Sequence, residues 1–171
     1  MLTKITLKPI GDIANDILEY LKERLKKTFG CPIEIIPQPI DLNSAYDPER
    51  GQYLAPALLA KLESQGALKD EKVLGIVDVD LYAPGLNFVF GQASTNSGIS
   101  IMSPYRLNEQ PADKAKFLGR ATKEAVHELG HTFGLEHCTD PMCVMHFSNS
   151  LQDTDIKGAT FCGHCRPKLI K

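Results

Sequence analysis

The 171-residue sequence has no tryptophan, no clear excess of charge of either sign and no long apolar run. Its 19 basic residues face 21 acidic ones, which argues against a nucleic-acid partner. No stretch of about 18 apolar residues occurs, so we expect no membrane-spanning helix and no membrane partner. The N-terminus, MLTKITLKPIGD, lacks the apolar core of a signal peptide, so we expect a cytoplasmic protein with reduced cysteines.

The chain has the length of one domain, and its hydrophobic fraction of 43% is that of an ordinary globular protein. Alternating and helical patterns predict a single α/β domain. Strands are expected at 2–8, 31–40, 72–82, 87–94 and 97–106, and helices at 12–29, 54–65 and 112–133. The residues after the last helix are expected to form a loop-dominated tail.

Residues 127–138 read HELGHTFGLEHC and hold three of the five histidines. On a helix, His127 and His131 lie one turn apart on the same face, where two imidazoles can bind one zinc ion. A catalytic zinc needs a third protein ligand and an open position for water, and His137 is the candidate for that ligand.

A continuous helix would carry His137 roughly 120° away from His131, at about 100° per residue. The helix must therefore end between them. Gly134 is expected to adopt a left-handed conformation there, because glycine takes positive φ at little cost. The chain can then return His137 to the metal.

Glu128 stands beside the two helical histidines and carries the predicted chemistry. A zinc-bound water has a pKa of about 7, so hydroxide is available at neutral pH. Glu128 is expected to take the proton of that water as general base and to return it to the leaving amine. The pattern therefore predicts zinc-dependent hydrolysis of an amide bond. A purely structural use of the histidines is the alternative.

Four of the five cysteines form the pairs C-x4-C and C-x2-C near the C-terminus. This spacing is close to that of structural zinc sites with four thiolate ligands. Two disulfides are the alternative, which the missing export signal disfavours. The expected ligands are Cys138, Cys143, Cys162 and Cys165.

The other residues of this region have expected roles as well. Because Cys138 follows His137, the second metal would anchor the loop that carries the third histidine. Basic side chains could offset the negative charge of four thiolates, the candidates being Lys157, Arg166 and Lys168. Cys31, His146 and His164 are not expected to be ligands.

The segments HELGHTFGLEHC (127–138), CVM (143–145), CGHC (162–165) and VDVDLYAPGLNFVFGQAS (77–94) together resemble the archaemetzincins, a branch of the metzincin zinc metallopeptidases. The resemblance implies an α/β (α+β) fold with a mixed five-stranded twisted sheet and an active-site helix. It also implies a cleft between an upper subdomain of about 1–134 and a small lower subdomain of about 135–171 that a structural zinc ion holds together.

The same resemblance implies the site residues and the substrate. His127, His131 and His137 would bind the catalytic zinc, the four cysteines a second, structural zinc, and Met145 would form the turn beneath the catalytic metal. Metzincins bind extended substrate along the edge strand, here Asn87 to Gln92. Some place a tyrosine two residues after the turn methionine, where this sequence has Phe147. A peptide or protein substrate and a monomeric state are expected.

Two other functions compete with the peptidase. The chain could be a zinc-stabilised binding module, or a metzincin-like protein without catalytic activity. The presence of Glu128, the expected general base, argues against a metzincin-like protein without catalytic activity.

Overall fold

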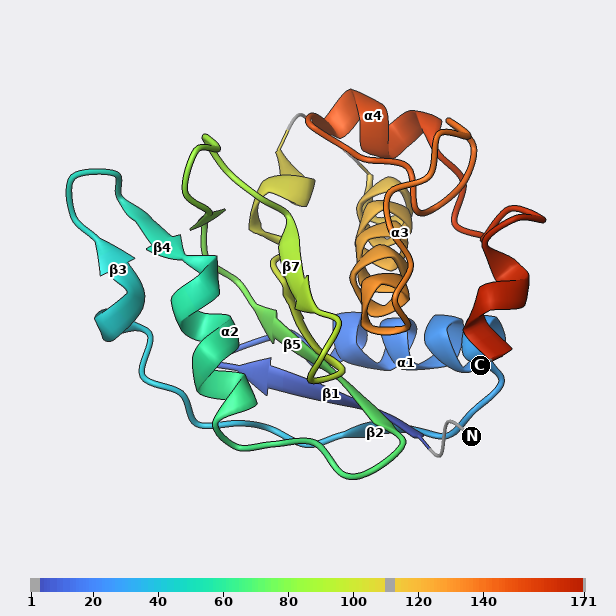
Figure 1. Cartoon of the computed structure of the whole chain (residues 1–171). Coiled ribbons are helices and arrows are strands. Elements are labelled where there is room, and N and C mark those ends of the chain that lie inside the picture. The colour runs from blue at the N-terminus through green and yellow to red at the C-terminus, as the bar shows by residue number, and fades with distance from the viewer. Residues whose placement is uncertain (1–3, 110–112, 171) are drawn as a thin grey trace.

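The computed structural model describes residues 4–109 and 113–170, and its main sheet has five strands in the order β2-β1-β5-β8-β7 (Figure 1). The first four strands in this order pair in parallel, and β7 pairs antiparallel with β8. The mixed five-stranded sheet is thereby confirmed. The strands are β1 (Lys4–Ile10), β2 (Ile33–Ile35), β5 (Glu71–Val77), β7 (Gly91–Ser94) and β8 (Ile99–Met102).

Helices cover both faces of this sheet. On one face lie α1 (Asn15–Phe29) and α3 (Lys114–Thr132), and on the other lies α2 (Ala55–Glu63). The side chains of β5 alternate between the two cores, as the period of two in a strand requires. Leu74 and Ile76 pack in the core with α1 and α3, whereas Val73 and Val77 pack in the core with α2.

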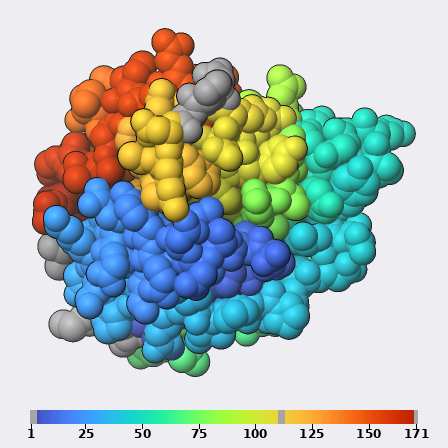
Figure 2. Space-filling view, turned by 180° about the vertical axis from the view of Figure 1, so that it is seen from behind, coloured from blue at the N-terminus to red at the C-terminus, as the bar shows by residue number. Residues whose placement is uncertain are grey.

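Segments on both sides of β5 in the sequence form a small second sheet. It contains β3 (Tyr46–Asp47), β4 (Gln52–Leu54) and β6 (Leu81–Tyr82), with a 3-10 turn at Asn43–Ala45 before it. The hairpin of β3 and β4 projects from the body of the protein (Figures 1 and 2). Figure 2, which shows the molecule from behind, also shows that α1 covers much of this rear face.

Two predicted strands are wrong in their extent. The strand expected at 72–82 ends at Val77, and Leu81–Tyr82 belongs to the second sheet. The strand expected at 87–94 joins the main sheet only from Gly91, because Val89 instead donates its backbone N–H to the Leu81 carbonyl. The predicted edge strand Asn87–Gln92 therefore enters the main sheet only through its last two residues.

Other predicted elements differ mainly at their ends. The strand expected at 31–40 is ordered as a strand only at β2, and prolines flank that short segment. The strand expected at 97–106 is β8, followed by a 3-10 turn at Tyr105–Asn108. The expected helix 112–133 is α3, and its first expected residue lies outside the described residues.

The C-terminal tail is mostly irregular, as predicted, but contains α4 (Leu151–Ile156) and a 3-10 turn at Arg166–Ile170. It packs beside α1 and α3 (Figure 1). The Phe29 ring at the end of α1 stacks on Phe133, with centroids 5.6 Å apart, and meets the edge of Phe161 at 5.9 Å. These rings join the helical layer to the tail. Within the described residues, no helix is long and apolar enough to cross a membrane.

Candidate metal centres

The three motif histidines come together at the end of α3. His127 and His131 lie one turn apart on the helix, and their Nε2 atoms are 3.1 Å apart. His137 follows the helix and joins them, so that one ring nitrogen from each residue lies within 4.8 Å of the others. Three neutral imidazoles at this separation fit a single zinc ion.

The helix ends as the sequence predicted. Gly134 has a φ of 83°, and its N–H donates to the His131 carbonyl at 2.9 Å. Leu135 donates to the Gly130 carbonyl at 3.3 Å, which closes the C-terminal cap. The chain reverses at this cap and brings His137 back towards the helical pair.

Backbone carbonyls orient two of the rings. The Nδ1 atom of His127 lies 2.8 Å from the Val144 carbonyl, and that of His131 lies 2.7 Å from the Leu135 carbonyl. Each Nδ1 must carry the proton to donate there, which leaves Nε2 free to bind a metal. Burial lowers the pKa of all three histidines below the ordinary value, and furthest for His127. The neutral ligand form is therefore favoured.

Glu128 lies in the same cavity, which has a volume of about 380 Å³. Burial raises its pKa well above the ordinary value, and the nearby Glu124 carboxylate adds to this effect. The Glu128 side chain packs against Gly91 of β7, where a Cβ atom would lie only 2.6 Å from Glu128 Cγ. A larger residue at position 91 would displace either the strand or this carboxylate.

Met145 lies beneath the helix that carries the histidines. Its side chain is buried, and its sulfur occupies the space that a Cβ atom on Gly130 would need. The Met145 carbonyl accepts the Cys138 N–H at 2.9 Å. Phe147, at the position where some metzincins have tyrosine, packs its ring 5.0 Å from that of His137 and lines the cavity. It offers no hydroxyl to a substrate.

The four C-terminal cysteines form a second group. Their sulfur atoms all lie within 4.8 Å of one another, and all four are free thiols. The structure thus brings together the predicted set Cys138, Cys143, Cys162 and Cys165. Four converging thiols fit a structural zinc site better than two disulfides, because each sulfur is near the other three.

The thiols of this group differ in acidity. Backbone N–H groups of Cys165 and His164 lower the pKa of Cys162 to about 7. Burial raises the pKa of Cys143 and of Cys165 above the ordinary value. Cys162 is thus the thiol that most readily becomes a thiolate ligand. Cys31, which does not belong to this group, is buried in the core.

Lys157, which was predicted to lie near the cysteines and offset their charge, instead pairs with a carboxylate beside the histidines. Lys157 is fully buried beside the histidines, and its ammonium lies 2.9 Å from Glu124 and 3.5 Å from His127 Nδ1. Its proposed role of offsetting thiolate charge is therefore wrong. Among the described residues, neither His146 nor His164 belongs to a ligand group. The Nζ atom of Lys168 lies 3.2 Å from His164.

Glu124 was not predicted from the sequence as a residue of the site. It lies one helical turn before Glu128 and lines the same cavity. The four-residue spacing was the available signal, but an isolated glutamate on a helix is usually solvated. Only the tertiary structure shows that Lys157 approaches it from the tail.

Comparison with known proteins places this chain in a family. The sequence model of peptidase family M54 matches residues 12–171. An archaemetzincin of Pyrococcus furiosus is 45% identical, covering 96% of this chain and 91% of that protein. The chain belongs to peptidase family M54. An archaemetzincin of Pyrococcus abyssi is 41% identical, covering 100% of this chain and 96% of the relative.

Solved structures agree with the M54 assignment. A zinc-dependent peptidase from Methanocorpusculum labreanum superposes with a TM-score of 0.87 at 32% identity, covering 96% of this chain and 99% of that one. Archaemetzincin of Methanopyrus kandleri gives 0.88 at 40% identity, covering 98% and 93%. Membership of M54 confirms both the resemblance to archaemetzincins and the predicted class, a zinc metallopeptidase.

Proposed function

We propose that this M54 peptidase hydrolyses peptide bonds with one zinc ion at the histidine group and holds a second zinc at the cysteine group. The single observation that carries the proposal is the convergence of three histidines beside a buried carboxyl in one cavity. His127, His131 and His137 would bind the catalytic ion. Bound zinc would acidify a water molecule and polarise the substrate carbonyl.

Glu128 is the proposed proton carrier. Its carboxylate takes a proton from the attacking water and returns it to the leaving amine. The raised pKa of Glu128 suits this role, because a stronger base accepts a proton more readily near neutral pH. Gly91 lets the edge strand approach this side chain, which brings a peptide bound along β7 near the carboxylate.

The chain is proposed to form an upper subdomain of about 1–134 and a lower subdomain of about 135–171, with the cavity between them. Residues from both parts line the cavity, among them Phe88 and Gln92 above and Phe147 below. The substrate is proposed to be a peptide or protein. A cytoplasmic, monomeric state without nucleic-acid or membrane partners stays a prediction.

Exchange of Glu128 for glutamine tests the mechanism. Glu128→Gln keeps the side-chain shape but removes the base, so hydrolysis of a peptide library should fall by about 10²–10⁴-fold. Zinc content, measured by elemental analysis, should stay at the wild-type value.

Glu136→Gln is the matched control. Glu136 belongs to the same motif but is exposed and does not line the cavity, so its exchange should leave the rate unchanged. Turnover by Glu128→Gln within about tenfold of wild type would rule out the general-base role. A wild-type protein that cleaves nothing in the library would support a catalytically silent chain.

A further inference from the structure

Lys157 and Glu124 form an ion pair in the interior, directly behind the histidine group. The side chain of Lys157 is 0% exposed and that of Glu124 is 3% exposed, and the ammonium lies 2.9 Å from the carboxylate. Burying two charges is costly unless they are paired and bonded to further polar groups. The amide hydrolysis proposed above assigns neither residue a role.

The ammonium of Lys157 lies close to three separate parts of the site. It binds Glu124 on α3 and lies 3.5 Å from His127 Nδ1. It also lies 3.4 Å from the carbonyl of His146, in the turn at 143–146 that contains Met145 and is called the methionine turn below. The Val144 carbonyl that accepts from His127 belongs to the same turn. Lys157 therefore lies where the methionine turn meets the ring of a proposed zinc ligand.

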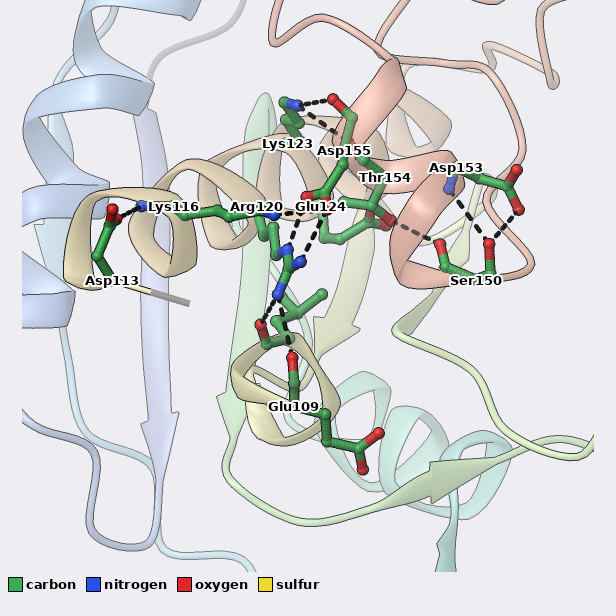
Figure 3. A network of polar contacts seen from close by, with 11 residues as sticks. Glu109, Asp113, Lys116, Arg120, Lys123, Glu124, Ser150, Asp153, Thr154 and Asp155 are labelled. Atoms are coloured by element: carbon green, nitrogen blue, oxygen red, sulfur yellow. Dashed lines mark hydrogen bonds and ion pairs between the residues drawn. The ribbon is translucent and has the colours of Figure 1, made fainter. Parts of the chain in front are cut away.

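Other contacts hold α4 and the residue after it against α3. Figure 3 shows Arg120, Lys123 and Glu124 of α3 facing Thr154 and Asp155 of α4. The Thr154 hydroxyl donates to Glu124 at 3.2 Å, and Lys123 donates to the carbonyls of Thr154 and Asp155 at 2.9 and 3.1 Å. Docking of α4 thus has its own bonds, and Lys157 is not needed for docking alone.

We propose that Lys157, anchored by Glu124, is a positioning residue for the catalytic metal site. By bonding to α3 and to the methionine turn together, it fixes the Val144 carbonyl that orients the His127 ring. Groups of this kind, which hold a ligand without touching the metal, typically change metal affinity by about 10–100-fold when removed. The inference rests on the proposed role of the histidine group as a zinc site.

The test measures zinc affinity at the histidine group by competition with a chelator, together with the absorption spectrum of Co²⁺ bound there. In Lys157→Met, we expect zinc affinity to fall by about 10–100-fold. The Co²⁺ spectrum should change because the ligand geometry is looser. Zinc at the cysteine group should stay bound.

A single substitution leaves Glu124 buried without its partner, so stability falls for a second reason. The double variant Glu124→Gln with Lys157→Met removes both charges and keeps the Thr154 contact. We expect its melting temperature to recover towards wild type while zinc affinity at the histidine group stays low. A purely structural ion pair would allow both quantities to recover.

Lys123→Met is the matched control, because Lys123 joins α3 to α4 without contact to His127 or the methionine turn. It should leave zinc affinity and the Co²⁺ spectrum at wild-type values. Glu124→Gln alone serves as a further variant and should weaken zinc binding several-fold.

Wild-type affinity in any folded variant that lacks the ion pair overturns the proposal. Equal losses in Lys123→Met and Lys157→Met would also overturn it, because docking of α4 would then explain both. Absence of zinc from the histidine group of the wild-type protein would instead refute the proposed function.

Discussion

The histidine group and the cysteine group meet in the sequence at His137 and Cys138, but different kinds of structure position them. Two of the three histidines project from one long helix, α3, which is packed against the sheet. All four cysteines lie outside the α-helices and strands, in the irregular chain after α3. The histidine group is therefore positioned by regular structure. The cysteine group instead brings together parts of the C-terminal tail that have little regular structure of their own.

This difference indicates what each metal would do for the fold. Removal of a metal from the histidines would leave α3 and its hydrogen bonds in place. Removal of a metal from the cysteines would leave four thiols, two of them buried, to hold the tail. Structural zinc sites often supply folding energy to such segments.

The largest expected effect follows from removal of a cysteine. In Cys165→Ser, residues 135–170 should lose protection from amide hydrogen exchange, because this segment would be held by the proposed four-thiolate site. Zinc binding at the histidines should weaken as well, by about 10–100-fold, since His137 precedes Cys138.

The paired variant His137→Ala should lose the catalytic metal but keep the exchange protection of the tail. Equal losses of protection in both variants would contradict the comparison, because the two groups would then contribute alike to folding. Wild-type protection in Cys165→Ser would show that packing alone orders the tail.

A smaller effect is expected from the ion pair that fastens α4. Both carboxylate oxygens of Asp155 bond to Arg120, at 2.7 and 2.8 Å, and this side-chain contact lowers the pKa of Asp155 to about 2. A carboxyl with a lowered pKa stabilises the fold above its unfolded pKa of about 3.9. That contribution is lost as the pH falls from about 4 to about 2.

Asp155→Asn should therefore be less stable than wild type at pH 7, and the difference should shrink across that acid range. Thermal unfolding of both proteins at several pH values measures it. A difference that stayed constant from neutral pH to about pH 2 would show that the charge of Asp155 is not responsible. The cysteine group should remain the stronger support of the tail at neutral pH.

The helices and the grouping of the histidines and of the cysteines were predictable because local rules decide them. The spacing of His127 and His131 places them on one helical face, and Gly134 is the residue that ends the helix with positive φ. The paired spacing of the cysteines indicated their shared site. Each of these signals is contained in a short segment.

The edge strand and the buried ion pair were not predictable, because distant segments decide them. Residues before Gly91 look like a strand, but Arg50 and Gln52 bind the Asn87 carbonyl and hold that segment away from the main sheet. From the sequence alone, Lys157 has the character of a surface residue. It is buried because it pairs with Glu124, which lies more than thirty positions earlier. Tertiary contacts outweigh local pattern at both places.

Zinc content before and after brief chelation tests the central claim most directly, that this peptidase has an open catalytic site and a closed structural one. We predict two zinc ions per chain at first. After chelation we predict one, with peptide hydrolysis lost and tail protection unchanged, because a three-ligand site releases metal more readily than a four-thiolate site. Hydrolysis that persists with the histidine group empty, or a single zinc from the outset, would contradict the account.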